Sequence, residues 1–344
     1  MSNAATQTPE LAVFSKDIRS MGLNPLWERT VSQKPGSPCL PNHWKWADLK
    51  PQLLRSSELI GAKEAERRVL MLENPQMPGS SFIANTLFTG LQIILPGEIA
   101  AAHRHTPNAL RFVVEGEGAY TSVNGERVMI NPGDFIVTPN WAWHDHGNIG
   151  KDAVVWMDGL DSAFTKFFGA TFREDYPTDT QPLYRSEGDS AASFGSALLP
   201  VDYKDDASGS PLLKYPYART LEALHHLHKT QPLHACHGVK LRYANPANGK
   251  YPFPTMAAFM QFLPRGFKGK AWRTTENIVF NVAEGSGVAV IAGERFAFSP
   301  HDIFVAPSWC DFAFEANGDC VIFSYSDRAA QESLGFHREE ALSA

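Results

Sequence analysis

The stretch NGERVMINPGDFIVTPNW (residues 124–141) is the strongest indication of the fold, because a related copy of it occurs later in the chain. Its second copy, AGERFAFSPHDIFVAPSW (292–309), keeps the turn residues and the apolar positions at an offset of 168 residues. Upstream, LRFVVEGEG (110–118) aligns with IVFNVAEGSG (278–287) at an offset of 169. An internal repeat of this kind indicates two copies of one domain.

Both copies consist of short runs rich in β-branched and aromatic residues. Between about 81 and 160 the runs FIANTLF, GLQIILP, ALRFVVEG, YTSVNG, ERVMI, DFIVTP and AVVWMDG are separated by turn residues. Such runs at regular short spacing are typical of an antiparallel barrel or sandwich. We therefore predict an all-β fold with two related barrels.

The composition of the flanking segments predicts the domain boundaries. We expect an N-terminal arm with short helices over 1–80, the first barrel over 81–165, a partly helical linker over 166–250, the second barrel over 251–330 and a C-terminal tail over 331–344. The linker contains the helix-compatible run ARTLEALHHLHK and an acidic, Ser/Gly-rich stretch, DYKDDASGS. Loss of the strand alternation marks it as a connecting region.

The overall composition excludes several classes of protein. Of the 344 residues 43% are hydrophobic and 20% charged, which is typical of a globular protein and not of a disordered chain, collagen or coiled coil. Lys and Arg number 31 against 37 Asp and Glu, so no basic excess favours nucleic acid. No apolar run approaches the roughly 20 residues of a membrane helix, and MSNAATQTPE lacks the pattern of a secretion signal. We expect a cytoplasmic protein with reduced cysteines and neither a nucleic-acid nor a membrane partner.

Three histidines in the first copy form a candidate metal site. His103 and His105 stand two apart in a strand-like segment, so their side chains share one face. His144 follows a second strand, where a barrel wall could return it beside them. Three neutral imidazoles inside a barrel make a transition-metal site with open positions for substrate and oxygen. The aligned positions of the second copy hold Trp272, Thr274 and Phe312, so only the first copy is expected to bind metal.

A histidine pair on a strand is more often surface or core filler, but the surrounding residues favour a metal site. They resemble the two consensus motifs of the cupin superfamily, carried here by Gly97, His103, His105, Gly116, Gly133, Pro139, His144 and Asn148. The resemblance implies that the barrels are double-stranded β-helices (jelly rolls), which makes the chain a bicupin. Two departures stand out. Ala109 and Leu110 occupy the places of the Glu ligand found in many cupins, and Trp141 replaces a usual glycine.

Longer strings identify a narrower resemblance. HRHTPNALRFVVEGEGAYTSVNGER, PGDFIVTPNWAWHDHGN, EAERRVLMLENP and KLRYANP resemble the gentisate 1,2-dioxygenase family, which includes salicylate and 1-hydroxy-2-naphthoate dioxygenases. The resemblance implies a homotetramer with one Fe(II) per subunit in the first barrel. It also implies an enzyme of aromatic compound degradation: an extradiol-type dioxygenase that cleaves gentisate (2,5-dihydroxybenzoate) with O2 between the carboxyl- and hydroxyl-bearing carbons, giving maleylpyruvate.

Two arginines are candidates for binding the substrate carboxylate. Arg111 lies six residues beyond His105, an even spacing that predicts an inward side chain if no bulge intervenes. A guanidinium matches a carboxylate bidentately, and the resemblance assigns Arg111 this role; a rim salt bridge is the alternative. The resemblance adds Arg67 from the arm as a second partner. Either Arg67 or the adjacent Arg68 could face inward, and an exposed helix position is the alternative.

The resemblance also implies further pocket residues. His146 shares a strand face with His144 and would hydrogen-bond a substrate oxygen or assist proton transfer; a supporting structural role is the alternative. Gln92 and Asp158 match pocket positions of the family, although each could simply satisfy local backbone groups. Phe88 is expected to line the pocket where the family often has Tyr, which leaves the preference among 2-hydroxybenzoates open.

Two rival classes of function compete with the dioxygenase. One is another cupin metalloenzyme, such as an isomerase or decarboxylase, and the other is a bicupin that only binds a small ligand. The intact histidines argue against the second, and the missing Glu with the nearby Arg111 argues against the first. A separate histidine group lies in the linker without a strand framework, and we expect no metal there: His225, His226, His228, His234 and His237.

Overall fold

The computed structural model describes residues 8–196, 198–205 and 208–342 and divides the chain into two compact units, Met1–Pro35 and Gly36–Ala344. The ends of the predicted arm and tail, and two residues of DYKDDASGS, lie outside the described residues. The first unit contains α1 (Pro9–Ser20) and the 3₁₀ helix η1 (Leu26–Glu28). Thr8 begins α1 by accepting a hydrogen bond from the Leu11 backbone N–H, and Pro9 follows it as the first helical residue.

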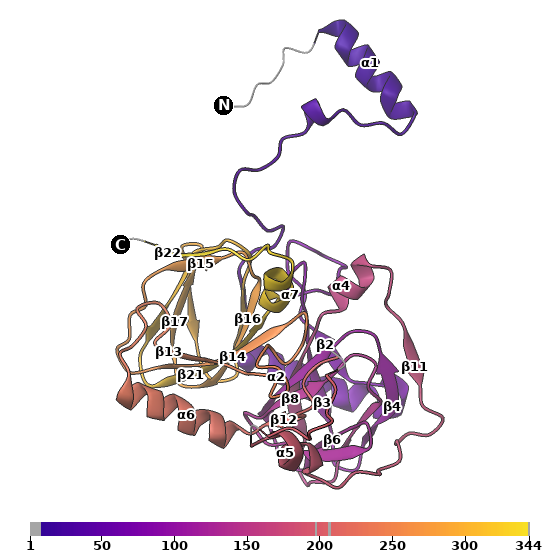
Figure 1. The fold of residues 1–344 in the computed structure, drawn as a ribbon, viewed down its shortest axis with the longest axis vertical. Coiled ribbons are helices and arrows are strands. Elements are labelled where there is room, and N and C mark those ends of the chain that lie inside the picture. Colours follow the sequence, from indigo (N-terminus) through magenta and orange to yellow (C-terminus); the bar gives the residue numbers. More distant parts are fainter. Residues whose placement is uncertain (1–7, 197, 206–207, 343–344) are drawn as a thin grey trace. The chain divides into compact units, whose positions relative to one another are not determined.

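Two β-barrels form the larger unit (Figure 1), which confirms the predicted all-β fold. The strands of the first barrel are β2 (Val69–Met71), β3 (Phe88–Ile94), β4 (Ile99–His105), β5 (Ala109–Glu115), β6 (Ala119–Val123), β7 (Glu126–Met129), β8 (Phe135–Thr138), β9 (His144–Asn148), β10 (Val154–Leu160), β11 (Arg173–Asp175) and β12 (Lys214–Tyr215). The strands of the second barrel are β1 (Asn42–Trp44), β13 (Val239–Arg242), β14 (Ala257–Leu263), β15 (Trp272–Thr274), β16 (Ile278–Glu284), β17 (Gly287–Ile291), β18 (Glu294–Phe298), β19 (Ile303–Ala306), β20 (Phe312–Ala316), β21 (Cys320–Ser326) and β22 (Glu339–Ala341). The helices of this unit are α2 (Trp46–Leu59), α3 (Ala62–Ala65), α4 (Ser162–Phe167), α5 (Asp189–Phe194), α6 (Tyr217–Thr230) and α7 (Arg328–Ser333).

The strand orders of the two barrels match one for one. The first barrel has sheets β12-β8-β5-β10-β3-β2 and β11-β4-β9-β6-β7, and the second has β1-β19-β16-β21-β14-β13 and β22-β15-β20-β17-β18. Each barrel takes an outer strand from a distant segment: β1, from the predicted arm, pairs with β19, and β12, from the predicted linker, pairs with β8. These pairings cross the predicted segment boundaries, because a strand edge accepts any extended segment that reaches it.

The repeat extends beyond the barrels, further than the sequence alignment reaches. A buried aspartate precedes each of the helices α4 and α7: Asp161 in the first copy and Asp327 in the second. Asp161 accepts a hydrogen bond from the Asn108 backbone N–H (2.8 Å), and Asp327 accepts one from Asn277 (3.0 Å). After the helices, β11 pairs with β4 and β22 pairs with β15. The segment 328–342 is therefore the counterpart of the segment that follows the first barrel.

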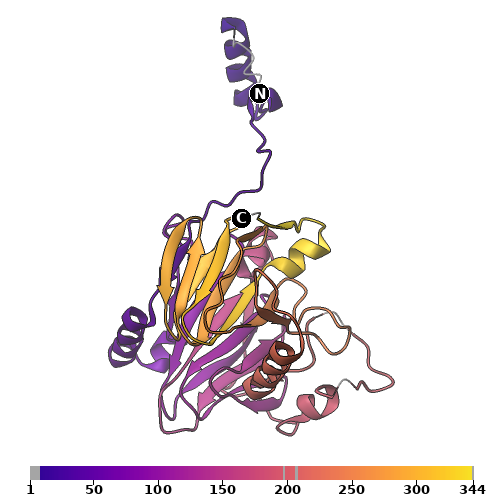
Figure 2. The same cartoon turned by 90° about the vertical axis from the view of Figure 1, so that its left-hand side faces the viewer.

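The barrels pack against each other through their six-stranded sheets (Figure 2). Side chains alternate along β5, so Phe112 points toward the second barrel while Arg111 and Val113 point into the first. The Phe112 ring stacks on Phe323 of β21 at 4.3 Å between centroids. Burial of such large aromatic side chains stabilises the pair of barrels as one body.

Aromatic rings fill the interior of the second barrel. Phe280 stacks on Phe304 with centroids 5.0 Å apart, and Phe314 packs against both. Trp272 and Phe312 lie directly opposite each other on β15 and β20, the places that His103 and His144 hold in the first barrel. This barrel packs apolar side chains where the first one gathers polar ones.

Gly116 and Gly285 occupy equivalent sharp turns, with φ of +90° and +84°. A Cβ at either position would lie 2.2 Å from a backbone oxygen, which explains why glycine is repeated at this place.

All four cysteines are free. Within the described ranges, none of the helices combines the length and the apolar character needed to span a bilayer.

Candidate metal centre

His103, His105 and His144 meet inside the first barrel. Strands β4 and β9 are neighbours, and His103 pairs directly with His144 across them. The ring centroids of His144 lie 4.2 Å from His103 and 4.8 Å from His105. One nitrogen from each ring lies within 4.8 Å of the other two, so the structure brings the predicted trio together.

Backbone carbonyls orient the rings. The Nδ1 of His105 lies 2.8 Å from the Pro107 oxygen, and that of His144 lies 2.9 Å from the Ala142 oxygen. A carbonyl can only accept, so Nδ1 donates and Nε2 keeps its lone pair for a ligand. The His144 Nε2 is buried and has no hydrogen-bond partner among the described residues. A buried nitrogen with a free lone pair fits a metal ligand.

Burial keeps the three imidazoles neutral, which is the form that binds a metal. Burial, with the charge of Arg67, lowers the pKa of His103 to about 2. Burial lowers the pKa of His105 to about 4 and that of His144 well below its ordinary value. A cation that needs three neutral nitrogen donors therefore fits this centre without competition from protons at neutral pH.

Arg67, and not Arg68, faces the histidines. EAERRVLML does not form one helix: α3 ends at Ala65, and β2 begins at Val69. In the turn between them the Arg67 guanidinium donates to the Ala101 carbonyl (2.8 Å) and contacts His103 Nδ1. The neighbouring Arg68 points elsewhere, because it forms an ion pair with Glu98.

Arg111 lies on the strand after the histidine pair, because β4 ends at His105 and the chain turns before β5 begins. Its Nε lies 3.2 Å from Asp158 Oδ1, and its Nη1 donates to Thr138 Oγ1 at 2.6 Å. The pair is in the barrel interior and not at the rim: Arg111 is 3% exposed and Asp158 6%. Burial raises the pKa of Asp158 to about 6, and Arg111 opposes that rise.

His146 extends the histidine row along β9. Its ring lies 5.7 Å from His144 between centroids, and its Nδ1 is 3.0 Å from the Thr121 hydroxyl. Its buried Nε2 has no hydrogen-bond partner within the described part of the chain. Burial lowers the pKa of His146 well below its ordinary value, so the ring is neutral.

Gln92 and Phe88 both lie on β3, in the same sheet as Arg111. Gln92 is buried and pairs with Trp156 of β10. The Phe88 ring lies beside Gly90, whose partner across the strands is Asp158. The described residues show no hydrogen bond or ring contact from Gln92 or Phe88 to the three histidines.

Two further residues, which no sequence signal had indicated, support the charged pair of Arg111 and Asp158. Thr138 accepts from Arg111, and Trp156 Nε1 donates to Asp158 at 3.1 Å. Neither role could be read from a sequence motif, because Thr138 of β8 meets Arg111 across strands and Trp156 meets Asp158 only through the orientation of their side chains on β10. Trp141, the residue that replaces a glycine of the cupin pattern, has φ +59°, a conformation that favours glycine. Its N–H donates to the His105 carbonyl (2.9 Å), so it fixes the end of β4.

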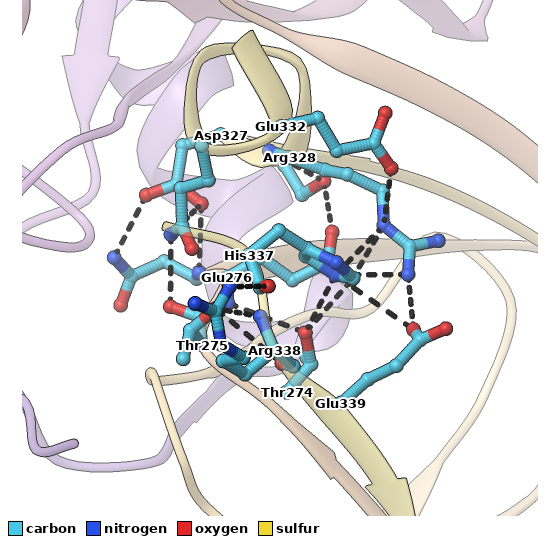
Figure 3. A network of polar contacts seen from close by, with 12 residues as sticks. Thr274, Thr275, Glu276, Asp327, Arg328, Glu332, His337, Arg338 and Glu339 are labelled. Carbon is cyan, nitrogen blue, oxygen red and sulfur yellow. Dashed lines mark hydrogen bonds and ion pairs between the residues drawn. The ribbon is translucent and has the colours of Figure 1, made fainter. Parts of the chain in front are cut away.

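A second group of possible metal ligands occurs in the second barrel: Glu276, His337 and Glu339 (Figure 3). The Arg328 guanidinium lies among them, with Nη2 2.9 Å from His337 Nε2 and in an ion pair with Glu339. Its Nε lies 3.5 Å from Glu276. Thr274, the counterpart of His105, joins this network through His337 (3.2 Å). The Arg328 guanidinium thus occupies the position that a metal ion would take among these three side chains.

Three of the five linker histidines pack on aromatic rings of the second barrel. His225 and His228 of α6 lie 5.2 and 5.1 Å from Phe262 between centroids. His237 lies 4.5 Å from Trp272. These contacts give His225, His228 and His237 a packing role.

Comparisons with known proteins match this picture. A family model described as "Cupin domain" matches residues 90–160. The chain is 47% identical over 335 residues to gentisate 1,2 dioxygenase 1 of Aquipseudomonas alcaligenes, covering 96% of both chains. It is 32% identical to a 1-hydroxy-2-naphthoate 1,2-dioxygenase of Nocardioides sp. (strain KP7), covering 98% of this chain and 89% of that one.

Solved structures agree with the sequence relatives. A salicylate 1,2-dioxygenase of Pseudoaminobacter salicylatoxidans, described as an adduct with gentisate, superposes with a TM-score of 0.92 at 32% identity, covering 100% of this chain and 97% of that chain. The similarity between the two structures extends over both barrels. With a bicupin fold, a buried three-histidine centre and near-full-length identity of 47%, this chain belongs to the gentisate 1,2-dioxygenase family.

Proposed function

We propose that this protein is an Fe(II)-dependent dioxygenase that uses O2 to cleave gentisate between its carboxyl- and hydroxyl-bearing carbons, giving maleylpyruvate. One observation carries the proposal: the three neutral histidines lie beside two arginines, the half-buried Arg67 and the buried Arg111, whose charges act on His103 and His105. The family relationship supports a dioxygenase.

His103, His105 and His144 would hold the iron. When bound, Fe(II) supplies open coordination positions for a chelating substrate and the redox chemistry with O2. Ala109 and Leu110 stand where a carboxylate ligand would be, so this ligand set brings no negative charge. A doubly charged metal held by neutral ligands attracts an anionic chelator such as a 2-hydroxybenzoate.

The arginines would bind the substrate carboxylate. Arg111 is held in place by Thr138 and Asp158, so its guanidinium is oriented before substrate arrives. Burial and the charge of Arg111 lower the pKa of Arg67 to about 10, because two cations are held close together. A carboxylate between them would relieve this repulsion and form charge-assisted hydrogen bonds. In this arrangement Asp158 positions Arg111.

His146 would interact with a substrate hydroxyl. Its neutral ring is held through Nδ1 by Thr121, which leaves Nε2 to exchange a proton or hydrogen bond with the substrate oxygen. Gln92 and Phe88 would form the wall of the pocket on β3. The position of Phe88 beside Gly90 makes this ring a determinant of which ring substituents fit.

The decisive experiment loads the protein with Fe(II) without oxygen and then supplies gentisate and O2. We expect oxygen uptake, an ultraviolet absorbance gain from the ring-opened product, and two ¹⁸O atoms in that product when ¹⁸O2 is used. Salicylate and 1-hydroxy-2-naphthoate are tested in parallel. Turnover of one of these but not of gentisate would overturn the proposed substrate, and no oxygen uptake with any of them would overturn the reaction class.

We also propose a homotetramer located in the cytoplasm, with one iron per subunit. Aromatic side chains fill the interior of the second barrel and leave no histidine centre among its described residues, so we propose that this barrel contributes to the assembly through its surface. Light scattering on the eluted protein measures the subunit number, and a mass other than four subunits would overturn it.

A further inference from the structure

A cavity of about 670 Å³ lies away from the histidine centre. Its walls come from β12 of the first barrel, from β13 and β14 of the second, and from helices α5 and α6. Small-molecule sites typically measure roughly 300–1,000 Å³, so the cavity has room for a ligand. None of the metal-centre histidines lines it, so this cavity is separate from the proposed reaction.

The lining combines an apolar body with positive charge. Leu212, Leu241 and Met260 provide aliphatic surface, and Phe194 and Tyr215 provide aromatic rings. Three cations also line the cavity: Lys214, Arg219 and Arg242. Among the described lining residues there is no Asp or Glu. An apolar cavity with cations and no carboxylates selects an amphipathic anion.

The three cations use only part of their donor capacity within the described residues. Lys214 Nζ donates to the Met129 carbonyl at 2.9 Å and forms an ion pair with Asp134 at 3.7 Å, while Arg242 Nη2 donates to the Gly249 carbonyl at 3.1 Å. Arg219 pairs through Nη1 with Glu222, one turn along α6 and outside the lining. An ammonium has three donors and a guanidinium five, so donors remain for an anion.

Tyr243 provides the second, independent observation. This residue is only 7% exposed at the cavity wall, and its hydroxyl has no hydrogen-bond partner among the described residues. Burial raises the pKa of Tyr243, and the nearby Thr220 hydroxyl opposes that rise. The two hydroxyls do not have the geometry of a hydrogen bond. A buried hydroxyl without a partner costs about 1–3 kcal/mol, and a ligand oxygen would remove that cost.

We propose that this cavity is a binding site for a small aromatic carboxylate. The ring of the ligand packs between Leu241, Met260 and Tyr215. The carboxylate accepts from the free donors of Lys214 and Arg219, and Tyr243 donates its hydroxyl proton to a ligand oxygen. The aromatic walls favour a ring over an alkyl chain, because offset and edge-on ring contacts add to the burial of apolar area.

To test the proposal, crystals of the iron-loaded enzyme are soaked with 4-iodobenzoate, and the iodine is located by anomalous scattering. An iodine peak inside the cavity is expected. The variant Ala223→Trp fills the cavity from an exposed position on α6 and should remove the peak. The matched control Ala218→Trp makes the same change on the same helix outside the lining and should keep it. Gentisate turnover should be unchanged in both. Iodine only at the histidine centre, or none at all, would overturn the proposal.

A solution measurement keeps the test independent of the crystal. Binding of 4-fluorobenzoate is followed by ¹⁹F NMR in the Arg111→Ala holoenzyme, whose proposed active-site binding is weakened. We expect Ala223→Trp to weaken the remaining binding at least tenfold, Tyr243→Phe to weaken it severalfold, and Ala218→Trp to leave it unchanged. Equal affinity in all of them would show that the probe binds elsewhere and that the assignment is wrong.

Discussion

Arg111 and Asp158 face each other across β5 and β10 inside the first barrel, with Arg111 Nε 3.2 Å from Asp158 Oδ1. Both side chains are almost fully buried, where a single charge costs several kcal/mol unless it is paired. Thr138 and Trp156 each satisfy one further polar atom of the pair. The barrel can therefore keep a guanidinium in its interior, in an orientation held by Asp158 and Thr138.

Removing Arg111 and removing Asp158 should have different effects, the first on catalysis and the second on stability. Arg111→Ala should weaken transition-state binding of gentisate by roughly 2–5 kcal/mol, because a buried charge partner of the substrate is lost. Asp158→Ala should lower the free energy of unfolding by about 3–5 kcal/mol, because Arg111 is left buried without its counter-charge. Steady-state kinetics and urea unfolding measure the two effects. An unchanged kcat/KM in Arg111→Ala would remove its proposed role.

Replacing a metal ligand should remove iron and activity together. His105→Ala takes away one of three nitrogen donors, so we expect less than about 0.1 iron per subunit and at least a 100-fold loss of turnover, since even residues supporting metal ligands typically contribute 10–100-fold. Plasma mass spectrometry measures the iron. His226→Ala, an exposed histidine on α6, is the control and should keep both. Iron retained in His105→Ala would show that the wrong ligands had been chosen.

The contact between the barrels should dominate stability. Phe323→Ala removes the ring that stacks on Phe112 and should lower the free energy of unfolding by about 3–5 kcal/mol, through lost burial and the cavity left behind. Urea unfolding followed by tryptophan fluorescence measures the change. Phe336→Ala is the matched control, because this phenylalanine is 64% exposed and its loss should change stability by less than about 1 kcal/mol. Similar losses in both variants would contradict the packing described above.

Asp327 should make stability depend on pH. Burial, with the neighbouring charge of Glu276, raises its pKa to about 6. An unfolded Asp has a pKa of about 3.9, so the folded state holds the proton more tightly. The resulting stability is present at about pH 4 and is lost as the pH rises through about 6.

The variant Asp327→Asn does not titrate. The stability of the wild type relative to this variant should therefore fall between about pH 4 and 6 and then level off. Urea unfolding at each pH gives the difference. Asp152→Asn, at an exposed carboxyl, is the control. A difference that grows with pH, or stays constant, would show that the Asp327 carboxyl is not held protonated by its surroundings.

The sequence by itself determined the two barrels and the three histidines. Strand alternation, turn glycines and the repeated NGER and AGER segments are local signals, because each reflects the conformation of neighbouring residues. The pair His103 and His105 could be placed on one face for the same reason. The absence of these histidines from the second copy could also be predicted from the sequence, because Trp272 and Phe312 occupy the positions aligned with His103 and His144.

The tertiary structure alone decided which charges meet. It selected Arg67 over Arg68, because the turn after α3 directs one toward His103 and the other toward Glu98. It also assigned β1 to the second barrel, about 260 residues away along the chain. Contacts such as Arg111 with Asp158 join distant strands and depend on register, which no short sequence pattern encodes. The spacing of residues therefore identified the candidate ligands, while the packing of the sheets determined their charged surroundings.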